Sequence, residues 1–478
     1  MALLLSNIKR KVSALSFSAT ARCLSLFVSS KPLEESIPDA RFLKHSTPEP
    51  RLVDHTPFLL FPQVRLSTLP NGIRVVTQAA PASSLHMASI GVWIDAGSRF
   101  ETPGTNGTAH FLEHMIFKGT RRRTSQSLEE EIENLGARLN AYTSREQTTF
   151  FADVQSKDIA VAVDVLADIL QNSRFPEHAI KRERGVILRE MEEVQGQMEE
   201  VIFDYLHAAA FYKHPLGDTI LGPEENIQAI SRVDLQKYIS SHYAGPRMVV
   251  SAAGAIKHDE VVNLVHRLFT KFSRDPTTAD QLVRAKPATF TACEVRVVND
   301  TMPLAHVAVA LKGAAWTDAN SIPVMVIQTL LGSWNKSAGV GNCSGSELAR
   351  RISTEGLAES MMAFNTNYRD TGLFGVYCTT TPDCLNGLSC VVMQEIRRLA
   401  YQVSEVEVIR AKNQMLTYGR VVPFPELFAR IDAVDAAAVK DIAGKFILNQ
   451  DVAIAAMGPV QGLPERSWFQ SQVRDEQN

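Results

Sequence analysis

Three side chains within one short segment have the types and spacing of a catalytic metal site. His110 and His114 are four residues apart, and Glu113 directly precedes the second histidine. Residues three and four apart share one face of a helix, so these side chains would converge. Two imidazoles can hold one Zn²⁺, and Glu113 could then take a proton from a water at an open metal position. The alternative is an amphipathic helix with two surface histidines.

The order H-x-x-E-H is the inversion of the commoner zinc-protease signature, and it leaves the metal one ligand short. The segment Pro176–His207 is predicted to be one long helix that carries Glu183 and Glu190. These two carboxylates are two turns apart and therefore nearly superposed on one face. Nearby acids are predicted to form only a solvated face, namely Glu192, Glu193 and Glu199.

The elements that must position these residues alternate between short strands and helices. The Asn71-Gly72 pair between two apolar runs predicts a hairpin. This alternation predicts an α+β fold built as α/β sandwiches. The further predicted strands are His86–Ile94, Ala137–Thr143, Gln147–Val154, Glu294–Val298 and His306–Leu311, and the further predicted helices are Ser127–Leu135 and Lys157–Gln171.

A weak internal repeat divides the chain into two related halves. The segment Leu235–Ile239 leading to Met248–Gly254 is echoed by Val439–Ile442 leading to Val452–Gly458. Each copy is predicted to be a helix followed by a buried strand that ends in glycine. The predicted boundaries are a presequence at 1–33, a disordered lead-in at 34–60, a catalytic domain at 61–272, a linker at 273–290, a second domain at 291–464 and a tail at 465–478.

The composition excludes several functional classes. A formal charge of −3 gives no bulk reason to expect nucleic-acid binding. The 6 cysteines form neither a C-x-x-C pair nor a disulfide framework, which fits a reducing compartment and no cysteine metal site. No apolar run reaches the roughly 18 residues that predict a transmembrane helix.

The N-terminus has a different character from the rest of the chain. Residues 1–33 are rich in serine, contain several lysines and arginines, and have no acidic residue before Glu34. Apolar residues can line one helix face there, as in an organelle presequence. A disordered basic tail is the plain alternative, and composition leaves a chloroplast address open.

Four longer motifs accompany the histidine segment: Asp95–Glu101, Asn140–Thr148, Arg182–Val194 and Ala358–Tyr368. With these motifs the chain resembles the mitochondrial processing peptidases of the pitrilysin-like (M16) zinc metallopeptidase family, on the side of their β subunits. The resemblance runs from about Val64 to Pro464 and is strongest to the plant type, which also serves as the core 1 subunit of the cytochrome bc1 complex.

The resemblance implies a role for each residue of the site. His110, His114 and Glu190 would be the zinc ligands, and Glu113 would activate the water. Glu183 matches a second family glutamate that supports the site. The helical spacing agrees, since Glu183 could hydrogen-bond a ligand histidine or Glu190.

The resemblance also implies a substrate class, namely basic presequences cut near an arginine. Glu200 and Asp204 match the family positions that recognise this arginine, and a carboxylate pair can take a guanidinium. Phe117 matches a contact for the residue after the cut, with core packing as the alternative. The strand around Asn140 and Ala141 matches the edge to which substrates add as a β-strand.

The implied partner is a homologous α subunit, which supplies a glycine-rich loop in an obligate heterodimer. The run Gly339–Asn342 is too short to be that loop, so the chain would be on the β side. The implied location is the mitochondrial matrix or the matrix face of the inner membrane. Two alternatives remain: a non-catalytic core subunit of the bc1 complex, or a cytosolic oligopeptidase, which would need about twice this length.

The chain departs from the family pattern in its second half. An additional stretch of helix is missing after Gln414, so an internal deletion is predicted near 414/415, which would shorten the second domain. The tail at 465–478 also lacks the usual aromatic and basic ending. We expect the metal site to be competent and the stability or α-subunit pairing to be impaired.

Overall fold

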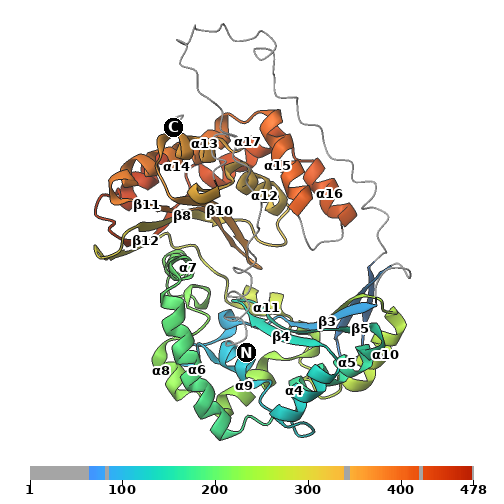
Figure 1. Cartoon of the computed structure of the whole chain (residues 1–478). Helices are drawn as coiled ribbons and strands as arrows, with labels where there is room; N and C mark the ends of the chain where they lie inside the picture. The colour runs from blue at the N-terminus through green and yellow to red at the C-terminus, as the bar shows by residue number, and fades with distance from the viewer. Residues whose placement is uncertain (1–63, 81–85, 339–344, 419–423, 476–478) are drawn as a thin grey trace, which may run out of the picture. The chain divides into compact units, whose positions relative to one another are not determined.

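The computed structural model describes residues 64–80, 86–338, 345–418 and 424–475. The predicted presequence, the lead-in and the Gly339–Asn342 run lie outside the described residues. The described chain contains two six-stranded sheets, each with helices packed against it (Figure 1). The prediction of an α+β fold with two related sandwiches is confirmed.

The first sheet has the order β1-β2-β6-β3-β5-β4. Its pairs are antiparallel except for β2 and β6, which run parallel. The predicted hairpin is β1 and β2, and Gly72 at its turn has a positive φ of 88°. The strands are β1 (Arg65–Thr68), β2 (Arg74–Ala79), β3 (Met87–Ile94), β4 (Arg138–Thr143), β5 (Thr148–Gln155) and β6 (Met248–Gly254).

The two faces of the first sheet differ in character because side chains alternate along each strand. Ile90 and Val92 point into the first core, which α5 and α10 close. Ser89 and Trp93 point to the other face, which is partly exposed. The helices of this half are α3 (Thr108–Met115), α4 (Ser125–Asn134), α5 (Ile159–Asn172), α6 (Glu177–Gln195), α8 (Glu224–Ala229), α9 (Arg232–His242) and α10 (His258–Leu268).

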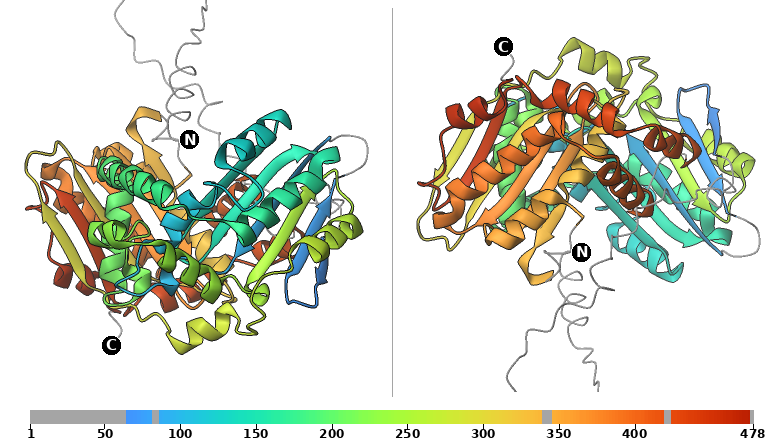
Figure 2. Two further views of the ribbon diagram at one scale, coloured as in Figure 1. Left: turned by 90° about the horizontal axis from the view of Figure 1, so that it is seen from below. Right: turned by 90° about the horizontal axis from the view of Figure 1, so that it is seen from above.

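The second sheet repeats the pattern with the order β7-β12-β8-β11-β10-β9, and β7 and β12 are its parallel pair. Figure 2 shows both sheets in two further views. The strands are β7 (Glu294–Val298), β8 (Ala305–Gly313), β9 (Ser333–Asn335), β10 (Ser360–Asn367), β11 (Gly372–Thr380) and β12 (Val452–Gly458).

The predicted repeat is confirmed as α9 with β6 and α17 (Ala436–Ile447) with β12. Both strands end in a glycine with positive φ, 112° at Gly254 and 105° at Gly458. A Cβ at Gly254 would lie 2.4 Å from the carbonyl oxygen of Met87, and one at Gly458 would lie 2.6 Å from that of Leu304. Both the left-handed backbone and the close approach therefore require glycine.

The predicted single helix Pro176–His207 is wrong, because it is two helices. The first, α6, is capped by Gly196, and Gln197 leaves helical geometry with ψ of 83° before α7 (Met198–Ala210) begins. Glycine is a weak helix former, so this break is the natural one in the segment. Glu200 and Asp204 therefore lie on a helix that is free to take its own direction.

The helix α7 packs against the second sheet, although it precedes that sheet in sequence (Figure 1). Val307 and Val309 of β8 face the main core of the second half, whereas Ala308 and Ala310 face α7. These small side chains allow the helix to approach the strands closely. The opposite face is covered by α12 (Ser321–Leu331), α13 (Glu347–Glu355), α14 (Leu385–Tyr401), α15 (Glu405–Tyr418), α16 (Phe424–Asp432) and α17.

Helices are present in two segments predicted to lie outside the domains, the linker and the tail. The linker region 273–290 includes α11 (Ala279–Ala285), and the tail includes α18 (Arg466–Gln472), whose Phe469 is fully buried in the second core. The position of the predicted deletion, 414/415, lies inside α15. The deletion itself and the domain boundaries stay predictions. In the part of the chain described, no helix has the length and apolar character needed to cross a membrane.

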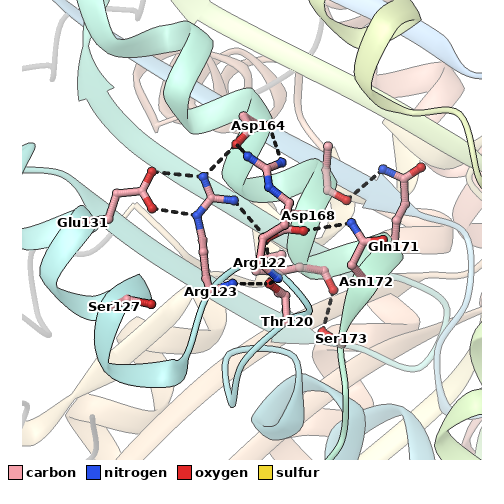
Figure 3. A network of polar contacts seen from close by, with 12 residues as sticks. Thr120, Arg122, Arg123, Ser127, Glu131, Asp164, Asp168, Gln171, Asn172 and Ser173 are labelled. Atoms are coloured by element: carbon pink, nitrogen blue, oxygen red, sulfur yellow. Dashed lines mark hydrogen bonds and ion pairs between the residues drawn. The ribbon is translucent and has the colours of Figure 1, made fainter.

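A network of charged side chains fixes the loop that follows α3 (Figure 3). The Arg123 guanidinium donates to Glu131 of α4 and to Asp164 and Asp168 of α5, at 2.6–3.0 Å. The Asp168 side chain is fully buried, and Thr120 also donates to it. The basic loop is thus used internally to join α3, α4 and α5.

We predict that Arg123→Met lowers the free energy of unfolding by about 3–5 kcal/mol, because it strands the buried Asp168 charge. Arg122→Met is the matched control: Arg122 also pairs with Asp164, but its side chain is 55% exposed. That pair should contribute about 1 kcal/mol or less. Chemical denaturation of the purified variants measures both effects, and equal losses would contradict this ranking.

Candidate metal centre

A buried carboxylate fixes the start of α3, the helix that carries the histidines. Glu101 accepts hydrogen bonds from the backbone N–H groups of Gly107 and Ala109 and from the amide of Asn106, at 2.6–3.0 Å. Burial nevertheless raises the pKa of Glu101 to about 7, against the lowering effect of these bonds. A carboxylate at this position satisfies helix N–H groups that would otherwise lack partners.

The rotation of α3 about its axis is set by its apolar side. Phe111, Leu112 and Met115 are fully buried in the first core. This packing places His110 and His114 together on a different side, with their rings in an edge-to-face arrangement and their centroids 4.8 Å apart. The predicted convergence of the two histidines is confirmed.

The helix α6 presents two carboxylates to these rings. The Glu190 carboxylate lies 3.7 Å from Nε2 of His110 and 3.2 Å from Nε2 of His114. One candidate ligand atom from each of the three residues lies within 4.8 Å of the others. The α6 stripe that holds them in place is Ala179, Ile180, Glu183 and Ile187, all buried.

Glu183 approaches the other nitrogen of His114, with Oε2 lying 3.6 Å from Nδ1. Its second oxygen pairs with the Lys118 ammonium at 2.9 Å. A carboxylate behind a ligand imidazole orients the ring and leaves Nε2 free for the metal. The predicted placement of Glu183 and Glu190 on one helix face is confirmed. Glu190 lies near the Nε2 atoms of both histidines, whereas Glu183 lies near Nδ1 of His114.

The electrostatics of the centre are those of a cation site. Burial would lower the pKa of His114, but the carboxylates of Glu183 and Glu190 raise it to about 9. Burial would raise the pKa of Glu183, but His114 and Lys118 lower it to about 2. Against the same effect of burial, His110 and His114 hold the pKa of Glu190 well below its usual range.

These residues fit a divalent metal. Two imidazole nitrogens and a carboxylate oxygen are a donor set that zinc accepts, and a tetrahedral site with bonds of about 2 Å separates its ligands by roughly 3.3 Å. The two oxygens of Glu190 lie near that distance, Oε1 at 3.7 Å from His110 Nε2 and Oε2 at 3.2 Å from His114 Nε2, and one ligand atom from each of the three residues lies within 4.8 Å of the others. With three protein ligands, a tetrahedral metal would have one further position for water. Glu113, on the same helix turn, is partly exposed.

The residues predicted to bind substrate lie outside this cluster. Glu200 is exposed in the first turn of α7, and Asp204 follows one turn later. Asn140 and Ala141 lie on β4, which ends the sheet order and pairs with β5 on one side. Phe117 is partly buried against the first core, 6.4 Å from the ring of Phe150, as the packing alternative predicts.

Three residues of the site have no role in the sequence prediction. They are Glu101, which caps α3; Lys118, which pairs with Glu183; and Arg145, which donates to Asp204 at 2.6 Å. Lys118 could have been found from its spacing of four from His114. Glu101 precedes α3 and is not on a helix with its partners, and Arg145 is far in sequence from Asp204, so helical spacing carries no signal for either.

Comparison with family profiles matches both halves of the chain. The family described as "Insulinase (Peptidase family M16)" matches residues 74–224, and "Peptidase M16 inactive domain" matches residues 229–415. The fold, the inverted histidine motif and these matches define a metallopeptidase that uses a divalent metal. The second match ends beside the predicted deletion.

Similar proteins narrow this class. The chain is 56% identical to the probable mitochondrial-processing peptidase subunit beta of Arabidopsis thaliana, over 90% of this chain and 85% of that protein. It is 46% identical to the mitochondrial-processing peptidase subunit beta of Bos taurus, over 86% and 88%. The chain belongs to the family of mitochondrial-processing peptidase β subunits in peptidase family M16.

A solved structure shows the same fold at low sequence identity. A chain of "Complex III2 from Candida albicans, Inz-5 bound" superposes with a TM-score of 0.75 at 21% identity, covering 86% of this chain and all of that one. This likeness shows that the chain and the solved structure have the same fold across both halves.

We predict that metal affinity rises with pH, because His114 with a pKa of about 9 must lose a proton before it can bind. The metal affinity should rise about tenfold per pH unit from pH 6 to 8.

In the metal-free chain, protonated His114 also contributes to the free energy of unfolding. This contribution is complete below about pH 6.5 and disappears as the pH rises through 9.

Competition with a chromophoric chelator across this range measures the slope. Glu183→Gln is the matched variant, since it removes a carboxylate that raises the His114 pKa, and its rise should level off at a lower pH. A metal affinity that does not change with pH in the native chain would contradict the prediction.

Proposed function

We propose that this chain is the zinc-dependent catalytic subunit of a peptidase that removes N-terminal presequences from proteins imported into mitochondria. The observation that carries the proposal is the intact centre of His110, His114 and Glu190, with Glu183 behind it. A chain retained only as a structural subunit is under no physical requirement to keep this donor set. The names of its relatives support the processing role.

His110, His114 and Glu190 would hold the metal, and Glu183 with Lys118 would orient His114. Zinc, when bound, polarises the scissile carbonyl and acidifies water. Glu113 accepts the proton of the attacking water and delivers it to the leaving amine. The Glu113 carboxylate is suited to this because it lies on the same helix turn as both histidines and is partly exposed.

Two features support a basic, extended substrate. The outer edge of β4, near Asn140 and Ala141, can take a peptide as an added strand through backbone hydrogen bonds, which tolerates many sequences. Glu200 and Asp204 on α7 offer carboxylates to an arginine near the cut. Phe117 is packed against the core, so any contact it makes with substrate would use its exposed part.

The partner is a homologous α subunit, and the working site is the mitochondrial matrix or the matrix face of the inner membrane. The names of the relatives support a mitochondrial β subunit. A core role in the cytochrome bc1 complex is compatible with this activity, and the solved relative belongs to a Complex III assembly.

We predict that Glu113→Gln abolishes cleavage without loss of metal. Cleavage of a synthetic presequence by the chain paired with an α subunit should fall by about 10²–10⁴-fold, the usual contribution of a general base. Zinc content, measured by metal analysis, should not change. Glu192→Gln on the exposed surface of α6 is the control. Undiminished cleavage by Glu113→Gln would overturn the assignment.

We predict that the arginine preference depends on α7. Glu200→Gln and Asp204→Asn should each raise KM for a peptide with the proximal arginine by roughly tenfold, because each removes a charge-assisted hydrogen bond. For a peptide in which norleucine replaces the proximal arginine, both variants should have the same KM as the native enzyme. If the native enzyme cleaves both peptides equally, the role of these carboxylates is wrong.

A further inference from the structure

Asp204, which the proposed function assigns to the substrate arginine, already has an arginine partner within the chain. Arg145 Nη2 donates to Asp204 Oδ1 at 2.6 Å. We propose that Arg145 is a specificity-positioning residue: it holds the Asp204 carboxylate in the orientation that recognises a planar guanidinium rather than any cation. This inference rests on the proposed function and adds a residue to it.

Arg145 is built into the structure on several sides. Its side chain is 9% exposed, and its Nε donates to the carbonyl oxygen of Leu216 at 3.1 Å. Its own carbonyl accepts the backbone N–H of Arg99 at 2.8 Å. A side chain with a buried stem and two different acceptors does not swing away readily, so Arg145 is a fixed donor and not an exchangeable occupant of the carboxylate.

This donor uses one side of Asp204 and leaves the other accessible. The hydrogen bonds found within the described chain engage Oδ1 only, and the Asp204 side chain remains 32% exposed. Glu200, one turn earlier on α7, is exposed. Two carboxylates and one guanidinium leave a single negative charge, which matches one substrate guanidinium. Orientation then favours arginine, since a lysine ammonium is a point charge that does not need an aligned acceptor.

The position of Arg145 explains why such a link is needed. It lies in the turn between β4 and β5 of the first sheet, whereas α7 packs against the second sheet. The first core therefore does not by itself set where α7 lies relative to β4. The Arg145–Asp204 bond joins the strand proposed to hold the peptide backbone to the helix proposed to hold its arginine side chain.

The same turn is held from the second half of the chain. Glu146, the next residue, accepts a hydrogen bond from Arg99 at 2.6 Å and from the backbone N–H of Arg369. Arg99 also forms a bidentate pair with Asp370, at 2.7 Å for both bonds. The base from which Arg145 reaches Asp204 is thus anchored independently of substrate.

The test measures cleavage of three presequence peptides that differ only at the proximal position, which carries arginine, lysine or norleucine. The enzyme is the full chain paired with an α subunit. For Arg145→Met, the ratio of kcat/KM for arginine over lysine should fall by about tenfold, mainly through KM of the arginine peptide. The value of kcat/KM for the norleucine peptide and the zinc content of the enzyme should not change.

Two variants sharpen the result. Arg145→Lys keeps the charge but cannot reach both Leu216 and Asp204 through a planar fork, so it should restore only part of the ratio. Arg267→Met, on the exposed side of α10, removes the same charge elsewhere and should have no effect. In an Asp204→Asn background, Arg145→Met should lower the ratio no further, because the two residues act as one unit.

Three outcomes would overturn the proposal. An unchanged ratio would mean that Arg145 does not affect specificity. An equal loss of kcat for all three peptides would mean a structural role only. Tighter binding of the arginine peptide would mean that Arg145 competes with substrate. Should Arg145→Met lose its fold, the ratio for Arg145→Lys decides alone, and a native value there contradicts the proposal. A native enzyme that cleaves none of the peptides would refute the proposed function instead.

Discussion

The metal centre depends on two helices being locked in rotation against one core. Each residue along a helix turns by about 100°, so a shift of one residue would carry His110 or Glu190 away from the common point. Burial of Phe111, Leu112 and Met115 fixes α3, and the stripe from Ala179 to Ile187 fixes α6. The Glu101 cap fixes where α3 begins. The catalytic geometry is therefore a consequence of core packing.

The centre is prepared for a cation before one is bound. Glu183 and Glu190 are held as carboxylates, and the positive charge that balances them in the metal-free chain is on Lys118 and on protonated His114. If His114 is a ligand as proposed, a divalent ion would replace its proton, and the Lys118–Glu183 pair could stay in place. The donor atoms are already gathered, since one ligand atom from each of the three residues lies within 4.8 Å of the others.

The sequence predicted the features that depend on local periodicity. His110 with His114 and Glu183 with Glu190 follow from spacing along one helix. The hairpin at Gly72 follows from its turn residues, and the repeat ending in Gly254 and Gly458 follows from the similarity of two short segments. The prediction of one helix over Pro176–His207 was wrong, because the chain changes direction at Gly196. The sequence is rich in charged residues on both sides of this glycine, so its pattern does not reveal the break. It was silent on Glu101, because this residue precedes α3 and does not share a helix face with the N–H groups it caps. It was also silent on Arg145, because its partner Asp204 is distant in sequence.

The two halves share one strand order but use the second face of the sheet differently. In the first half this face carries Ser89 and Trp93 and is partly exposed; in the second half Ala308 and Ala310 receive α7. The helix proposed to read the substrate thus belongs in sequence to the half with the metal but in packing to the other half. A defect in the second half would therefore displace α7 before it disturbed His110, His114 or Glu190. We expect the changes predicted near 414/415 to affect substrate selection more than metal binding.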